Sequence, residues 1–199
     1  YSAFIFNASK HLIEFYYQHT KNEKFLTLEN LKEIARQKGD SLLFATNAGI
    51  FDTNYQSVGL FVSNGQELTP LNIQDGDGNF FLKPNGVFFI KEDGTLGILE
   101  SEEFKDSSIN VLYATQSGPL LLRNDQIHPA FNEGSHNQLV RSGVGVISQT
   151  EAVFLISRNP VNFYEFSRAF REKFNCRHAL YLDGVISQAY FWGYLEKLE

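Results

Sequence analysis

The chain has 199 residues, of which 43% are hydrophobic and 20% charged; this balance fits one globular domain over residues 1–199 and excludes a disordered chain. The formal net charge is −6 and no basic block occurs, which excludes an electrostatic surface for nucleic acid, and no apolar run is long enough for a membrane span. The single cysteine, Cys176, excludes an internal disulfide, and we expect it to be a small buried apolar residue.

The first fifty residues predict a hairpin, a helix and a short strand. Aromatic-rich runs on both sides of a turn-like segment predict the hairpin over residues 3–17. Thr27 has the side chain of a helix N-cap and Gly39 can stop a helix, and the apolar residues between them predict a helix over 28–38. Residues 42–45 are apolar and predict a short buried strand.

The stretch from 57 to 157 alternates strand-like runs with turn residues. Most connections are too short to contain a helix, so most neighbouring strands should pair antiparallel. The predicted strands cover 57–62, 86–90, 96–99, 111–115, 120–122, 143–148 and 152–157.

A second helix is predicted over residues 163–174. Asn162 can cap it, Glu165 completes a capping-box-like pair, and phenylalanines recur at helical spacing along one face. Such a stripe is typical of a helix docked on a sheet. The chain then returns as a strand over 179–182. The predicted fold class is α+β, a single domain with a large, mostly antiparallel sheet and two main packing helices.

The start of the chain carries its own signal. It contains no methionine and begins at Tyr1 with a strand pattern. We therefore expect a processed or truncated product, and a periplasmic or secreted protein fits this pattern.

Four segments share one design, in which an apolar run meets glycine beside a polar or charged residue. Glycine allows the backbone to turn sharply or to approach a ligand closely, and the polar neighbours are of the kinds that bind polar substrates. The design predicts one pocket built from several strand ends. The segments are 47–52, 116–119, 141–145 and 182–187.

Asp183 is the first candidate for chemistry, because it follows the buried strand 179–182 and precedes Gly184, which leaves room for a substrate. A carboxylate there can act as an acid, a base or a ligand. The alternative is a turn aspartate that bonds its own backbone. Asp52 would complete the two-carboxylate arrangement of glycoside hydrolysis, with a plain loop charge as the alternative.

Three further residues are candidates for binding. Asn47 can donate to and accept from a sugar hydroxyl, and the alternative is a left-handed turn asparagine. Arg141 is a planar partner for phosphate or carboxylate, and the alternative is a surface arginine at a strand start. Ser117 lacks the elbow sequence of α/β-hydrolases, so we interpret it as a hydrogen-bonding residue before a tight turn.

The sequence predicts no metal site and no cofactor. No two of the five histidines have the close helical spacing of a zinc site, and residues 75–79 resemble only a fragment of a calcium loop. His128 lies in a long loop, roughly 125–139, of the kind that can form a lid. It could act as an acid or base there, and the alternative is a surface histidine.

Taken in order, these motifs resemble the phosphodiester glycosidase family. This family includes the catalytic domain of the lysosomal uncovering enzyme, N-acetylglucosamine-1-phosphodiester α-N-acetylglucosaminidase, and the closer resemblance is to its bacterial exported branch. Each motif is short, and their joint order carries the resemblance. The matching stretches are 47–51, 78–88, 116–119, 141–145 and 182–184.

The resemblance implies hydrolysis of a sugar-1-phosphodiester in the cell envelope, with a sugar-phosphate small molecule or a glycan as the binding partner. Asp183 would then be the acid/base or the nucleophile. Arg141, together with Lys83, would neutralise the phosphodiester. The implied pocket residues are Asn47, Gly49, Ser117, Gly118, Arg141, Asp183 and Gly184, and the same motifs add Asn79, Asn85, Gln116 and Ser142 as substrate-binding candidates.

Two other functions stay open on the sequence. One is a non-catalytic module that binds carbohydrate or glycan phosphate in the same pocket. The other is a structural subunit whose exposed aromatic residues form a protein interface. The sequence indicates no oligomeric state.

Overall fold

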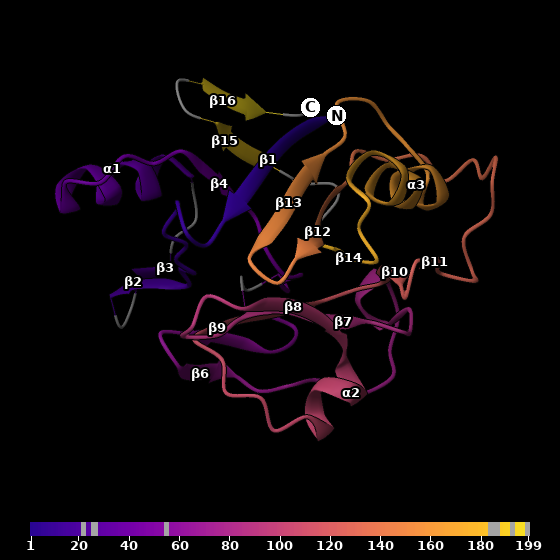
Figure 1. Cartoon of the computed structure of the whole chain (residues 1–199), viewed down its shortest axis with the longest axis horizontal. Coiled ribbons are helices and arrows are strands. Elements are labelled where there is room, and N and C mark those ends of the chain that lie inside the picture. Colours follow the sequence, from indigo (N-terminus) through magenta and orange to yellow (C-terminus); the bar gives the residue numbers. More distant parts are fainter. Residues whose placement is uncertain (21–22, 25–27, 54–55, 183–187, 192–193, 198–199) are drawn as a thin grey trace.

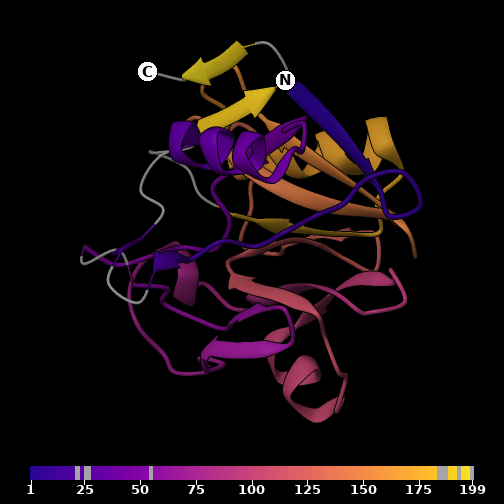
Figure 2. The ribbon, with the colours of Figure 1, turned by 90° about the vertical axis from the view of Figure 1, so that its left-hand side faces the viewer.

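The computed structural model describes residues 1–20, 23–24, 28–53, 56–182, 188–191 and 194–197. It has the mixed α+β fold expected from the sequence, and the strand pairs of the described part are antiparallel. The expected large antiparallel sheet is divided into two main sheets, which lie one above the other in Figures 1 and 2.

The upper sheet in Figure 1 brings the start of the chain beside its second half. Ser2 lies opposite Ile156, and Gly143 lies opposite both Leu155 and Tyr181. Within the described residues the strand order is β1 (Ser2–Asn7), β13 (Glu151–Ile156), β12 (Ser142–Ser148), β14 (His178–Tyr181), β10 (Leu120–Arg123) and β11 (Gln126–Ile127).

The lower sheet comes from the middle of the chain. Gly86 pairs with Glu100 on one side and with Ser117 on the other. Within the described residues the strand order is β6 (Gln66–Thr69), β5 (Phe61–Ser63), β9 (Tyr113–Ser117), β7 (Gly86–Ile90) and β8 (Leu96–Glu100).

The two sheets share one hydrophobic core. Phe88 and Ile90 of β7 point into it from the lower sheet, and Val144 and Leu180 point into it from the upper sheet. Because side chains alternate along a strand, the intervening residues of β7 face away from this core and pack on the other side of the lower sheet. The short helix α2 (Ser101–Asp106) covers that side through Phe104.

Helix α3 (Phe163–Phe174) has the bounds predicted from the sequence and covers the outer face of the upper sheet. The side chain of Asn162 accepts a hydrogen bond from Glu165 N at 2.8 Å, as the capping pattern indicates. The helix lies close to β12 at Gly145, where an added Cβ would come within 2.6 Å of the Phe170 ring. Cys176 is buried at the same contact, as expected, and its burial raises the pKa of the thiol to about 12.

A smaller unit lies at one side of the molecule (Figure 1). Helix α1 (Leu28–Lys38), also predicted with these bounds, contacts β4 and β15. These two strands form a small sheet with β16, and a short β2–β3 pair lies nearby in sequence. Their bounds are β4 (Phe44–Thr46), β15 (Gln188–Phe191), β16 (Tyr194–Lys197), β2 (Gln18–Thr20) and β3 (Glu23–Lys24). No helix of the described residues is long and apolar enough to cross a membrane.

The predicted hairpin over residues 3–17 is wrong in its pairing. Its first half forms β1, but this strand pairs with β13, and residues 11–16 are not a strand. They cross the mouth of a cavity instead, where Phe15 O accepts a hydrogen bond from Ser63 Oγ at 2.8 Å. The apolar runs indicated burial correctly, but their alternation could not identify the partner strand.

Candidate functional site

The polar–glycine segments meet at one end of the two main sheets. Gly49 N donates to Thr115 Oγ1 at 3.1 Å, which joins the segment after β4 to the middle of β9, next to Gln116. Ser117 Oγ donates to the Leu182 carbonyl at 2.8 Å, and Leu182 N donates to the Ser142 carbonyl at 3.0 Å. Three segments, 47–52, 116–119 and 141–145, therefore meet the described start of the fourth.

The key residues of that fourth segment, Asp183 and Gly184, lie outside the described residues. Leu182 is the last described residue before them and is buried at this junction. The assignment of Asp183 as the chemical group therefore stays a prediction, attached to a strand end whose position is known.

The glycines of the junction are needed for contacts within the protein. A Cβ on Gly49 would come within 2.4 Å of the Gln116 carbonyl oxygen. A Cβ on Gly118 would come within 2.6 Å of the Phe80 carbonyl oxygen and within 2.7 Å of the Asn85 Cβ. Glycine was expected here because it allows another group, such as a ligand, to approach the backbone closely. At Gly49 and Gly118 the groups that approach are atoms of the protein itself.

Gln116 is fully buried and its amide is saturated with hydrogen bonds. Oε1 accepts from Leu60 N at 3.0 Å and from Asn72 N at 2.9 Å. Nε2 donates to the Asn72 carbonyl at 2.7 Å and to Ser101 Oγ at 2.8 Å. These four bonds use the capacity of an amide side chain, so in this structure Gln116 organises loops rather than facing a substrate.

The motif over residues 78–88 forms a short helix, a connecting loop and the start of β7, and it packs against Gly118 of the junction. Asn85 is buried, and its Nδ2 donates to the Phe80 carbonyl at 2.9 Å. Asn79 begins the one-turn helix η1 (Asn79–Phe81) and is partly exposed. Lys83 is exposed, and its Nζ donates to Asp75 Oδ1 at 2.7 Å, which lowers the pKa of that carboxyl group. The Lys83 ammonium is thus already paired with a carboxylate.

His128 is only 6% exposed and acts as a structural hydrogen-bonding group. Its Nε2 lies 3.0 Å from the Lys83 carbonyl, and its Nδ1 accepts from Ala130 N at 3.1 Å. An acceptor at Nδ1 and a donor at Nε2 define a neutral imidazole. Burial lowers the pKa of His128, and the bond to the Lys83 carbonyl opposes this shift.

Arg141 is fully buried on the side of the upper sheet that faces α3. Nε donates to the Val161 carbonyl at 2.8 Å, and Nη2 donates to the Asn137 carbonyl at 3.0 Å. The guanidinium carbon lies 3.6 Å from the centroid of the Phe163 ring. Arg141 therefore ties the loop before β12 to the N-terminus of α3, in place of the expected surface or pocket position.

One nitrogen of the Arg141 guanidinium, Nη1, can still donate a hydrogen bond to a further partner. Nη1 is buried and has no hydrogen-bond partner among the described residues. Burial lowers the pKa of the guanidinium below its usual range, and Tyr181 opposes this shift. A direct contact with phosphate stays a prediction, and it would require Nη1 to become accessible.

Asp52 is exposed in a loop. Its Oδ1 accepts from Gln56 N at 2.9 Å, and its own N–H donates to the Gln56 carbonyl at 2.8 Å. This is the geometry of a turn aspartate. The proposed pairing of Asp52 with Asp183 stays a prediction.

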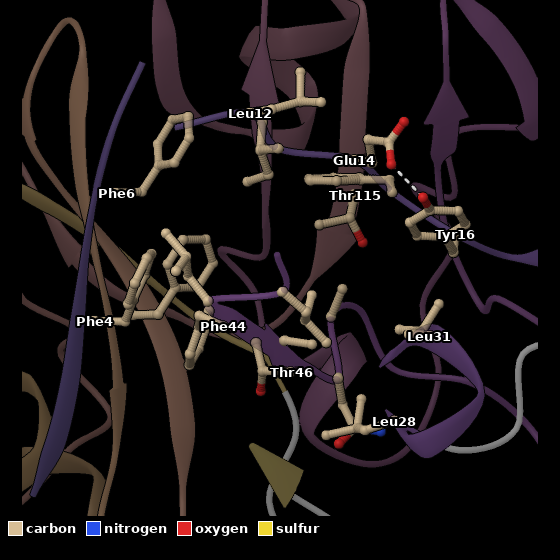
Figure 3. A pocket seen from close by; sticks show the side chains of 18 of the residues that line it. Phe4, Phe6, Leu12, Glu14, Tyr16, Leu28, Leu31, Phe44, Thr46 and Thr115 are labelled. Carbon is tan, nitrogen blue, oxygen red and sulfur yellow. Dashed lines mark hydrogen bonds between the residues drawn. The ribbon is translucent and has the colours of Figure 1, made fainter. Parts of the chain in front are cut away.

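A cavity of about 520 Å³ opens beside the junction. Asn47, Gly49, Thr115 and Leu182 belong to its wall, so the cavity adjoins the junction at the segment 47–52, at Thr115 and at Leu182. Much of the remaining wall is aromatic or aliphatic, and Figure 3 shows Phe4, Phe6 and Phe44 on one side and Leu28 and Leu31 on the other. Among the described residues no group of three or more histidine, cysteine or acidic side chains could hold a metal ion.

Comparison with known proteins decides the family. Residues 40–197 match the model of the phosphodiester glycosidase family. This chain belongs to that family. Over 191 residues it is 37% identical to the uncharacterized protein YigE of Escherichia coli strain K12, an alignment that covers 96% of this chain and 74% of YigE. The family resemblance inferred from the motifs is confirmed.

A solved structure shares the fold of this phosphodiester glycosidase. It is the zebrafish N-acetylglucosamine-1-phosphodiester alpha-N-acetylglucosaminidase catalytic domain, auto-inhibited by its pro-peptide, with a TM-score of 0.56 and 22% identity. The match covers 78% of this chain and 55% of the zebrafish chain. This chain therefore spans about half the length of that protein, and the likeness concerns the fold alone.

Sequence reasoning missed the apolar half of the site. Thr115 was read only as part of a strand, although it directly precedes Gln116 and its hydroxyl holds Gly49. The sequence predicts residues 12–17 as the second strand of a hairpin, although they line the cavity. The many aromatic residues near the N-terminus indicate burial, but they do not distinguish a strand from the wall of a cavity.

Proposed function

We propose that this phosphodiester glycosidase hydrolyses the bond between the anomeric carbon of a sugar and the phosphate of a phosphodiester. Family membership over residues 40–197 supports the reaction class. The observation that carries the proposal is the junction of three polar–glycine segments with Leu182 at the wall of a 520 Å³ cavity. A convergent set of polar groups at a cavity is the usual form of a substrate site.

The proposed reaction adds water across one bond. The water oxygen bonds to the anomeric carbon, the bond from that carbon to the phosphate oxygen breaks, and the products are a free sugar and a phosphomonoester. Asp183 acts as the acid/base or as the nucleophile, because it directly follows Leu182. Asn47 lines the cavity, where its amide can orient sugar hydroxyls.

In this proposal Ser117 and Arg141 do not contact the substrate but hold neighbouring backbone groups in position. The Ser117 hydroxyl donates its hydrogen bond to the Leu182 carbonyl, which leaves the Ser117 oxygen as an acceptor only. Arg141 fixes the loop that leads into Ser142, whose carbonyl in turn holds Leu182 N at 3.0 Å. Both residues thereby fix the backbone that precedes Asp183.

The test is a turnover assay with a panel of sugar-1-phosphodiesters and with detection of both the free sugar and the phosphomonoester. We expect Asp183→Asn to reduce turnover by about 10²-fold or more, the usual cost of losing a general acid or base. Asp125→Asn is the matched control, because Asp125 lies in an exposed turn at φ 70°, a conformation that asparagine tolerates well.

Two results would contradict the hydrolase. One is a wild-type protein that turns over no member of the panel. The other is an Asp183→Asn variant as active as Asp125→Asn. Binding of a phosphodiester without turnover, retained in Asp183→Asn, would instead identify a non-catalytic module that binds carbohydrate or glycan phosphate.

We also propose a periplasmic or secreted location, where the substrate would be a sugar phosphodiester of the cell envelope. Fractionation of cells that produce the full-length protein tests this location. Recovery of the protein only with the cytoplasmic fraction would contradict it.

A further inference from the structure

The cavity beside the junction has the size of a small-molecule site. Its volume of about 520 Å³ lies within the roughly 300–1,000 Å³ typical of ligand pockets. The wall is mixed: Asn47 and Thr115 are its polar residues at the junction, and the other polar or charged ones are Lys10, His11, Glu14, Asp40, Ser41, Thr46 and Ser57. Its apolar part is formed by aromatic and aliphatic side chains, with Phe4, Phe6 and Phe44 on one side in Figure 3 and Leu28 and Leu31 on the other.

The aromatic wall of the cavity is held by stacking. The rings of Phe4 and Phe44 lie parallel, with an angle of 3° between them and centroids 4.7 Å apart. Phe44 also contacts the rings of Phe154 and Phe191, with centroids 5.4 Å and 5.2 Å away. Rings fixed on several sides keep their rotamers, so this wall exists before any ligand arrives.

Two exposed leucines line the cavity beside charged and polar residues such as Lys10, His11 and Asp40. Leu12 lines the cavity and is 79% exposed, and Leu43 lines it and is 38% exposed. The nearby Glu14 carboxylate already binds Lys38 Nζ at 3.2 Å and the Tyr16 hydroxyl. These exposed leucines offer an apolar chain a surface to contact where it leaves the cavity.

We propose that the cavity binds the apolar aglycone of the substrate, a single alkyl or prenyl chain esterified to the phosphate, while the sugar and phosphate lie at the junction. This inference rests on the proposed function and adds the substrate class. A second sugar in the part of the cavity that phenylalanines and leucines line would leave its hydroxyls without hydrogen-bond partners there, which is costly. A hydrocarbon chain has no polar groups, so it contacts the same side chains without leaving any hydrogen bond unmade.

The first test measures binding and does not depend on turnover. Calorimetric titrations compare glycerol phosphate, butyl phosphate, octyl phosphate and dodecyl phosphate, each below its aggregation concentration. We expect affinity to rise about fourfold for each buried methylene until the cavity is full. Equal affinity for glycerol phosphate and octyl phosphate would overturn the proposal.

Variants locate the binding. Ala35→Phe fills the cavity from α1, and Leu12→Glu places a charge at its mouth. Each should reduce octyl phosphate affinity by about tenfold or more, since several buried methylenes lose their contacts. Leu68→Glu is the matched control, because Leu68 is a 42% exposed leucine of β6 that does not line the cavity.

A dependence of affinity on chain length that survives in both cavity variants would contradict the proposal. Since Leu12 is largely exposed, its variant keeps the test open if Ala35→Phe does not fold.

The last test separates this proposal from the hydrolase. It uses alkyl esters of the sugar 1-phosphate that gives the fastest turnover in the panel. Equal kcat/KM for butyl and octyl esters would remove the apolar subsite and leave the hydrolase intact. Tight binding of octyl phosphate, with no ester hydrolysed, would remove the hydrolase and leave the apolar site.

Discussion

The geometry of the junction depends on which atoms its polar side chains bond. Gln116 and Asn85 direct their amides to backbone groups of neighbouring loops, whereas Asn47 lies on the cavity wall. Arg141 and His128 likewise bond carbonyl groups of the chain. At the residue scale, many of the polar groups in the family motifs build the site, and few of the described ones face the cavity.

Gln116→Leu should lower the free energy of unfolding by at least about 3 kcal/mol. The change removes four hydrogen bonds and leaves Leu60 N and both backbone groups of Asn72 without their partner, at about 1–3 kcal/mol for each buried unsatisfied group. Urea unfolding measures the loss. Gln66→Leu, at an exposed position of β6, should change stability by less than about 0.5 kcal/mol. Similar losses in both variants would refute the structural assignment of Gln116.

The lowered pKa of His128 predicts that the protein loses stability in mild acid. Burial lowers the folded-state pKa of His128, so as the pH falls below the usual histidine value of about 6.5 the unfolded chain takes up the proton first. The stability that neutral His128 contributes is complete above a pH of about 6.5 and is lost as the pH falls towards the pKa of His128 in the folded protein. Burial lowers the pKa of His178 too, and this acts in the same direction.

Urea midpoints between about pH 8 and pH 5 test this sign. We expect the decline towards acid to be shallower for His128→Gln than for His136→Gln, which replaces an exposed histidine of the same loop. A decline equally steep in both variants would show that His128 does not titrate with unfolding.

At the element scale, α3 and the upper sheet fit together through two glycines of β12. A Cβ on Gly143 would come within 3.2 Å of both Phe166 and Phe170, and a Cβ on Gly145 within 2.8 Å of the Cys176 sulfur. The helix therefore lies nearer to β12 than side chains on those positions would permit. This contact holds the strand that begins at Ser142 and leads away from the junction.

Gly145→Ala should destabilise the protein by about 1–3 kcal/mol, the usual cost of an extra methyl group in a filled core. Phe170 is the neighbour that has to move, because the new Cβ would lie 2.6 Å from its ring. Thermal or urea unfolding of Gly145→Ala, Phe170→Leu and the double variant measures the coupling. The double variant should be less destabilised than the sum of the single ones, and simple additivity would contradict the contact.

Local signals predicted elements better than they predicted partners. The bounds of α3 followed from Asn162 and the phenylalanine stripe, which act within a few residues of each other. The pairing of β1 with β13 depends on residues from opposite ends of the chain, so the run after residue 11 was wrongly made its partner. The same limit applied to the site. The sequence identified the junction segments, but not that the partners of Arg141 would be Val161 and Asn137.

At the scale of the whole molecule, the two main sheets are held by one common core. Phe88 and Ile98 of the lower sheet belong to the same cluster as Phe154 and Leu180 of the upper sheet. Neither sheet can lose this contact without exposing the inner face of the other. The assignment of residues 1–199 to a single domain stays a prediction from the sequence, and this common core makes it testable.

The common core predicts one cooperative unfolding transition. Far-UV circular dichroism follows the backbone, and near-UV circular dichroism follows the packing of the aromatic side chains. We expect the two urea curves to coincide, as for a single domain without populated intermediates. Two separated transitions would show that the sheets unfold independently and would contradict the single domain.

The pairing of distant segments also determines when the protein can fold. Ser2 lies opposite Ile156, and Thr46 lies opposite Ala189, so each of these early strands has its partner far towards the C-terminus. A ribosome releases the N-terminus first, and loops of this length must close before such contacts form. The nascent chain therefore carries β1 and β4 as unpaired apolar strands until most of the polypeptide has been synthesised. These two segments are the ones that a chaperone would have to shield during that interval.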